Sequence, residues 1–142
     1  MTPQPTSQRG GMLIEVLVAI LIFSVGVLAM VKLQAAAVKQ SADAEYRSLA
    51  AMLANDLVSR MWGTDRKLDT LQNTYGKAGS ASYEDWVASI RDSKLPRALD
   101  DNNKPSVSVV SAQGGAQVTI TLNWQAPGET DRHQYVTTVL MK

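Results

Sequence analysis

The sequence predicts an α+β protein in which one long N-terminal helix packs on a small antiparallel β-sheet. No proline interrupts residues 11–62, and in the second half of this stretch apolar side chains recur every three or four residues, which is typical of a helix. Three short segments near the C-terminus alternate instead between apolar and polar residues, which is typical of strands.

Residues 11–31 form an apolar run with Glu15 as its one charged residue. At 1.5 Å per residue the run spans about 30 Å, the thickness of the hydrocarbon core of a membrane. A carboxylate inside a bilayer costs roughly 2.5–3.5 kcal/mol on insertion scales, so Glu15 needs a partner that its own helix does not supply. Gly26 lies within the run, where a small residue permits the close approach of a neighbouring helix.

Residues 32–62 continue the helix with an amphipathic pattern. Asp56 and Arg60 stand four residues apart, at the spacing of a helical ion pair. The pair Trp62-Gly63 is a natural stop for the helix. The apolar stripe comprises Val38, Ala42, Tyr46, Leu49, Leu53, Leu57 and Met61.

Residues 63–142 are predicted to form a head with one short helix and three strands. A polar connection covers residues 64–82, and a helix with a Ser-x-x-Asp start at Ser82 follows and ends at Leu95-Pro96. The predicted strands are Ser106–Ser111, Gln117–Trp124 and Gln134–Met141, with Gly114-Gly115 as a turn between the first two. The apolar face of this sheet must be covered, and the stripe of the long helix is the available partner.

Composition and motifs argue against several functions. The net charge is +1, with 14 basic and 13 acidic residues, so no basic face for nucleic acid is expected. Cysteine is absent, which excludes disulfides and thiolate metal sites. His133 is interpreted as a solvated loop residue, and Asp100-Asp101 lacks the remaining ligands of a calcium loop. We therefore expect a non-enzyme with no catalytic, cofactor-binding or metal residues and no small-molecule substrate.

The segment Arg9-Gly10-Gly11-Met12-Leu13-Ile14-Glu15 resembles the class III leader of type IV pilins and their relatives. The resemblance implies that residues 1–10 are a leader, that Arg9 contributes to its recognition, and that a prepilin peptidase cuts between Gly10 and Gly11. The amine of Gly11 would then be methylated. Glu15, as the fifth mature residue, would form the assembly ion pair, and Gly26 would be a point of helix flexibility. Gly11 departs from the family, which often has Phe there.

The same resemblance implies location and partners. The chain would cross the inner membrane once, with a cytoplasmic N-terminus and a periplasmic head, and would then join a pilus fibre on the cell surface. Its partners would be the prepilin peptidase and other major and minor pilins, contacted through the N-terminal helix. The segments 13–19 and 24–26 resemble minor pilins of the PilV type, which implies a role in pilus assembly, twitching motility or adhesion.

Three alternatives remain open at this stage. A minor pseudopilin of a type II secretion system shares the leader and the helix. A single-pass membrane anchor that displays a periplasmic binding domain would keep its leader uncut. An ordinary signal peptide would be cut near Ala35-Ala36-Ala37. Basic residues lie on both sides of the apolar run, so the positive-inside rule does not decide the orientation.

Overall fold

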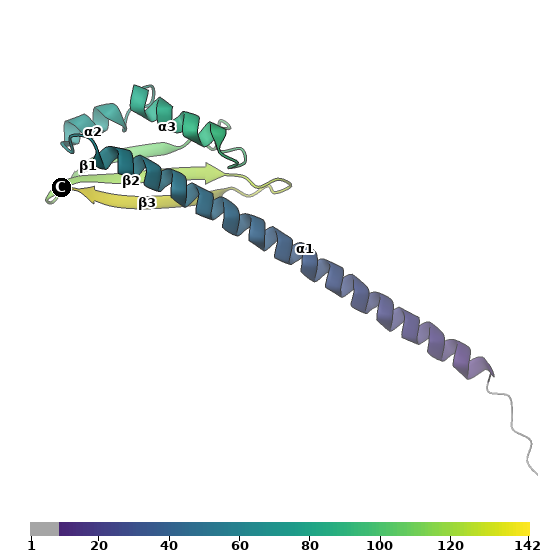
Figure 1. Cartoon of the computed structure of the whole chain (residues 1–142). Coiled ribbons are helices and arrows are strands. Elements are labelled where there is room, and N and C mark those ends of the chain that lie inside the picture. Colours follow the sequence, from purple (N-terminus) through teal and green to yellow (C-terminus); the bar gives the residue numbers. More distant parts are fainter. Residues whose placement is uncertain (1–8) are drawn as a thin grey trace, which may run out of the picture. The chain divides into compact units, whose positions relative to one another are not determined.

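The computed structural model describes residues 9–142, and residues 1–8 of the predicted leader lie outside the described residues. It contains three helices and one sheet, and it confirms the predicted α+β class; Figure 1 labels the helices and strands. The elements are α1 (Arg9–Trp62), α2 (Leu68–Thr74), α3 (Ala81–Asp92), β1 (Ser106–Ala112), β2 (Gly115–Trp124) and β3 (His133–Met141). The chain divides into two compact units, Met1–Ser41 and Ala42–Lys142. The second unit is called the head below, and it includes residues 42–62 of α1 in addition to the predicted head of residues 63–142.

The sheet is antiparallel, with its strands in the order β1-β2-β3. Its register places Val109 opposite Val118, and Val118 opposite Val139. All three predicted strands are therefore present, each longer than predicted by one or two residues. The turn between β1 and β2 consists of Gln113 and Gly114, because Gly115 already pairs with Ala112.

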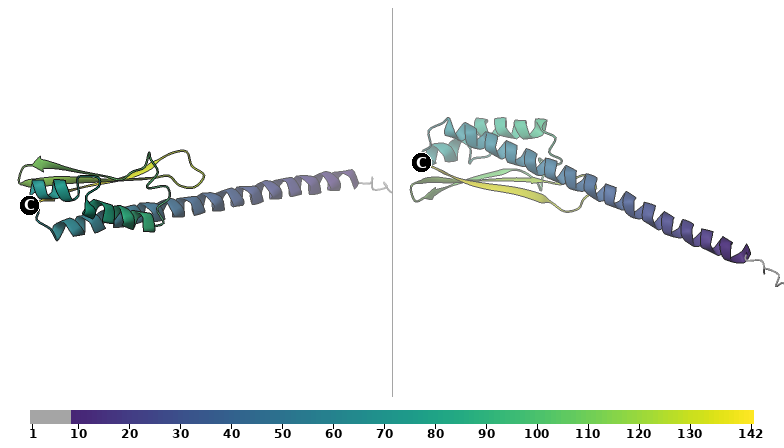
Figure 2. Two further views of the ribbon diagram at one scale, coloured as in Figure 1. Left: turned by 90° about the horizontal axis from the view of Figure 1, so that it is seen from above. Right: turned by 60° about the horizontal axis from the view of Figure 1, so that its bottom comes forward.

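Helices cover one face of the sheet, as the two views of Figure 2 show for the head. Residues on that face of β2 alternate with more exposed residues along the strand, which places Val118, Ile120, Leu122 and Trp124 in the core. From α1 the core receives Ala50, Leu53, Ala54, Leu57 and Met61, and from α3 it receives Trp86 and Ile90. The sheet face and the helix stripe thus bury each other, as predicted.

Polar contacts fasten α2 and α3 to their neighbours. The indole Nε1 of Trp86 in α3 donates to the carbonyl oxygen of Leu53 in α1 at 2.9 Å. The side-chain amide of Gln72 in α2 donates to the carbonyl oxygen of Val109 at 2.9 Å. This second bond occupies part of the open edge of β1, where an unpaired strand would otherwise be exposed.

Three details of the sequence interpretation were wrong. The connection 64–82 contains α2, which was missed because its seven residues are mostly polar and only Leu71 is buried. Helix α3 begins two residues earlier than a cap at Ser82 would place it, with Ser80 in the N-cap position. The side chain of Ser80 donates to the carbonyl oxygen of Thr74 at 2.6 Å and so links the two helices. Val38, predicted to lie in the stripe, is 71% exposed.

Candidate functional site

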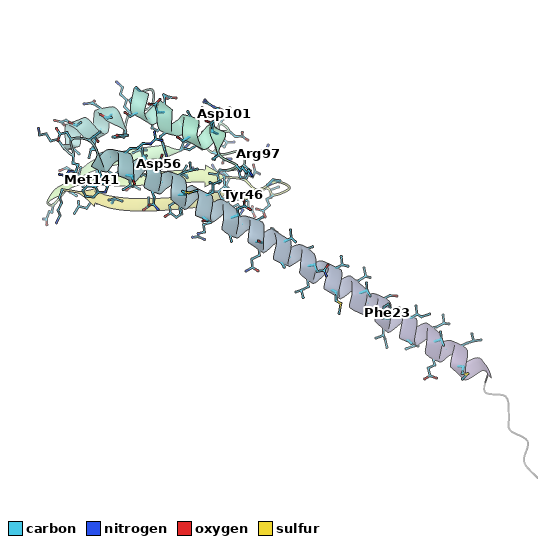
Figure 3. The ribbon with its side chains drawn as sticks, in the orientation of Figure 1. Phe23, Tyr46, Asp56, Arg97, Asp101 and Met141 are labelled. Atoms are coloured by element: carbon cyan, nitrogen blue, oxygen red, sulfur yellow. The ribbon has the colours of Figure 1, made fainter. Side chains whose placement is uncertain are left out.

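The first candidate site is the part of α1 that precedes the head. Every residue from 11 to 41 is exposed in the isolated chain. Phe23 is 72% exposed, and its side chain projects away from the helix in Figure 3. Among the described residues this is the one helix that is long and apolar enough to cross a membrane, although a signal sequence passes the same test. So much exposed apolar surface requires a lipid or protein environment.

Glu15 stands out within this segment because no described residue compensates its charge. In the described part of the chain its carboxylate forms no ion pair and no hydrogen bond. The other polar side chain of the apolar run is satisfied locally, since the hydroxyl of Ser24 donates to the carbonyl oxygen of Ile20 at 2.7 Å. No partner for Glu15 is therefore found among the described residues of the isolated chain.

The predicted cleavage site lies in the first turn of α1, because the helix begins at Arg9. Gly10 and Gly11 are both helical, and a Cβ atom added to Gly11 would meet no atom within 4 Å. The first four N–H groups of a helix have no intrahelical acceptor, and glycine is about 1 kcal/mol less favourable than alanine in a helix. The backbone at Gly10-Gly11 is thus held weakly.

Gly26 lies in uninterrupted helix. A Cβ atom added there would meet nothing within 4 Å, so the isolated chain itself does not require glycine at this position. Glycine at this position would matter for the close approach of a neighbouring helix or for the predicted local flexibility of α1.

The interpretation of His133 as a solvated loop residue was wrong. His133 is the first residue of β3, and its ring stacks on Trp124 with centroids 5.6 Å apart. Its Nε2 atom lies 2.5 Å from Oε2 of Glu129. Strand pairing of His133 with Trp124 brings the two rings together, a relation that loop composition does not reveal.

Three side chains of the described chain could together hold a metal ion: those of Asp43, Glu129 and His133. One ligand atom from each lies within 4.8 Å of the others, and all three residues are partly buried. The hydrogen bond between His133 and Glu129 accounts for the closest approach without a metal. Packing at the end of the sheet explains the position of the His133 imidazole better than metal binding does.

No family model, curated protein or solved structure matches this chain. Its classification therefore depends on its architecture. A long apolar N-terminal helix followed by a small antiparallel sheet is a pilin-like arrangement.

Proposed function

We propose that the protein is a minor pilin, made as an inner-membrane precursor and assembled into a type IV pilus, or priming one, after a prepilin peptidase removes residues 1–10. The observation that carries the proposal is an apolar helix segment, residues 11–41, in which every residue is exposed and which holds one carboxylate without a partner among the described residues, Glu15, four residues after Gly11. On this proposal the protein is not an enzyme. It is the substrate of one, and it functions by association with other pilins.

Cleavage is the first step of this function. A peptidase must hold its scissile bond in an extended form, so the helix has to open locally at Gly10-Gly11. The missing intrahelical acceptors and the low helix propensity of two glycines reduce the free energy of that opening. In the proposal Arg9, at the cytoplasmic side, helps the peptidase to recognise the leader.

Cleavage also creates the group that Glu15 lacks. It converts the amide nitrogen of Gly11 into a positive amine, which is methylated in the proposal. Within one subunit the two residues lie about 6 Å apart along the helix axis, since each residue rises 1.5 Å. Pairing the amine of one subunit with Glu15 of the next would remove two lone charges from an apolar bundle and would set the axial register of the subunits.

The substitution Glu15→Gln tests the pairing step. It keeps the shape and hydrophobic length of the helix, so we expect normal insertion into the membrane. Breaking a buried ion pair costs about 3–5 kcal/mol, and the ratio of sheared-fibre protein to membrane protein should fall roughly tenfold or more. The matched control is Glu45→Gln, which removes one exposed carboxylate from α1 within the head. Incorporation of the Glu15→Gln chain at the wild-type ratio would contradict the role of Glu15.

The resemblance of segments 13–19 and 24–26 to PilV-type minor pilins favours the pilus over the pseudopilus of a type II secretion system. The helix itself fits both machines, so a gene deletion separates them. Loss of piliation and twitching would support the pilus, whereas loss of exoprotein secretion with normal piliation would support the pseudopilin. An uncut chain in a strain that has the peptidase would instead support the single-pass anchor.

A further inference from the structure

The outer edge of β3 is an unpaired part of the sheet. Because the strands lie in the order β1-β2-β3, both β1 and β3 are edge strands. At the β1 edge, the side chain of Gln72 in α2 already uses the carbonyl oxygen of Val109. Among residues 9–142, β3 pairs with β2 alone, and Figure 1 shows it in yellow at the margin of the sheet. Every second residue of β3 therefore directs its backbone N–H and C=O groups away from β2, where no strand receives them.

The sequence of β3 does not block the addition of another strand. Natural proteins protect exposed edges with lysine, proline, a β-bulge or a short strand. Residues 134–141 contain no charged residue and no proline. Pairing with β2 continues without a bulge over all nine residues of β3, from Trp124 opposite His133 to Ala116 opposite Met141. Strands usually have about 5–6 residues, so the β3 edge is long and regular as well as uncharged.

Apolar side chains on both faces of β3 are partly exposed. On the face that points away from the core, Val136 is 49% exposed and Leu140 is 39% exposed. On the opposite face, Tyr135 and Val139 pack against the hydrophobic core but are only partly buried. A strand added beside β3 would cover part of these four side chains, so apolar burial would accompany the new backbone hydrogen bonds.

A second copy of β3 matches this edge. Two antiparallel copies pair over all nine residues when the two-fold axis passes through Thr137. Tyr135 of each copy then lies opposite Val139 of the other, and aromatic and β-branched side chains are favourable neighbours across strands. An interface between identical strands brings like charges close together wherever the strand is charged. Residues 134–141 carry no charge, so β3 can pair with itself without this repulsion.

We propose that two copies of this protein associate through β3, and that their antiparallel β3 strands join the two three-stranded sheets into one continuous sheet. About half of the residues of each strand face the partner, which gives about eight to ten hydrogen bonds, close to the roughly ten of a typical specific interface. A charged peptide strand fits less well, because residues 134–141 offer its charges no partner. The proposal is independent of pilus assembly through the N-terminal part of α1, since β3 belongs to the head.

Disulfide cross-linking tests the pairing, because the chain has no cysteine of its own. The full-length variant Thr137→Cys is oxidised in detergent micelles with copper phenanthroline. On the axis the two Cα atoms would lie about 4.5–5.5 Å apart, within the disulfide range of about 4.4–6.8 Å, so we expect a cross-linked dimer. The matched control is Thr121→Cys, at a position of the same exposure class on β2, whose two copies would lie at least about 14 Å apart. Absence of the Thr137→Cys dimer, or equal cross-linking of both variants, would overturn the proposal.

A mixture of two variants tests the register. Gln134 lies opposite Leu140 of the second copy when the axis passes through Thr137. Gln134→Cys and Leu140→Cys should therefore cross-link with each other, and neither should cross-link with itself, because identical positions would be about 20 Å apart along the strands. Self-cross-linking of either variant at the level of the mixture would contradict this pairing.

A charge at the edge provides a test that needs no cysteine. Val136→Lys introduces the kind of side chain that protects natural edges, and it should weaken dimerisation at least tenfold in sedimentation equilibrium with density-matched detergent. Thr121→Lys is the matched control, because it adds the same charge at the residue opposite Val136 on β2, and it should dimerise as the wild type does. Association through the exposed part of α1 would respond to neither variant, so equal dimerisation of the two would overturn the proposal. Thermal unfolding confirms that each variant is folded, and if Val136→Lys fails to fold, the cross-linking decides.

Discussion

At the scale of single residues, Tyr83 connects α3 to the start of the sheet. Its hydroxyl donates to the carbonyl oxygen of Pro105 at 2.7 Å. Burial raises the pKa of Tyr83 above its ordinary value of 10.0, and the adjacent negative charge of Glu84 raises it further. The folded state thus favours the neutral phenol, which is also the form that can donate the hydrogen bond.

The substitution Tyr83→Phe should lower the free energy of unfolding by about 0.5–1.5 kcal/mol at neutral pH, because one hydrogen bond is lost. The raised pKa gives this contribution a defined pH dependence. It is complete below pH 10.0, the unfolded value, and it declines as the pH rises through the folded pKa, since the unfolded state loses its proton first. Urea unfolding of both chains at about pH 8 and about pH 11 measures the change. A difference between the chains that grows at the higher pH would contradict this account.

Gly115 is a position at which the fold requires glycine. Its φ is +157°, and an added Cβ atom would collide with the carbonyl oxygen of Met141 on the paired strand. Gly115→Ala should therefore destabilise the head by more than about 3 kcal/mol, since the backbone of β2 or β3 must shift.

Gly128→Ala is the control for Gly115→Ala. Its φ is +80°, but an added Cβ atom would meet nothing within 4 Å, so only the cost of the left-handed conformation, about 1–2 kcal/mol, is expected. Thermal and urea unfolding of the two variants measures the contrast. Equal destabilisation would show that the close approach of Gly115 to Met141 is unimportant.

At the scale of elements, the spacing of apolar residues predicted the helix and the strands that are long and regular. The three strands follow from alternation because one sheet face is buried and the other is exposed. The long helix follows from an unbroken sequence that ends at Trp62-Gly63. By contrast, α2 could not be predicted, because it buries Leu71 alone and is stabilised by contacts such as Gln72 with Val109 that join residues distant in sequence.

The contact of the loop after α3 with the loop between β2 and β3, and the environment of His133, were unpredictable for the same reason. Asp100–Asn103 reads as a turn cluster in the sequence, and nothing local indicates that Arg132 lies beside Asn102. The Glu15 segment was recognisable because its signal is local, a single carboxylate at the start of an apolar run.

The substitution Gly26→Leu tests the role of α1 as a packing element. A larger side chain meets no atom of the isolated chain, and leucine is a better helix former than glycine by roughly 0.8 kcal/mol, so membrane insertion should be unchanged. If a neighbouring helix approaches closely at Gly26, the amount of protein in sheared fibres should fall several-fold. Leu28→Ala, at an exposed position on the same helix, is the control for a change of size. Normal incorporation of Gly26→Leu would remove Gly26 from the assembly surface.

At the scale of the whole molecule, the chain joins a head whose apolar core is buried to a helix segment whose apolar side chains are exposed. All residues of the hydrophobic core and those packed against it lie in the head. The preceding stretch of α1 buries nothing in the isolated chain. In the proposed function, the exposed helix serves first as a membrane anchor and then as the contact with other subunits.

The most direct test of the central claim is intact-mass and N-terminal analysis of the protein made with and without a prepilin peptidase. We expect loss of Met1–Gly10 and methylation of Gly11 only when the peptidase is present. An intact Met1 in the presence of the peptidase would contradict the assembly mechanism and leave the protein as a membrane anchor. A cut near Ala35–Ala37 would contradict it as well, since the released domain would retain its core and lose Glu15.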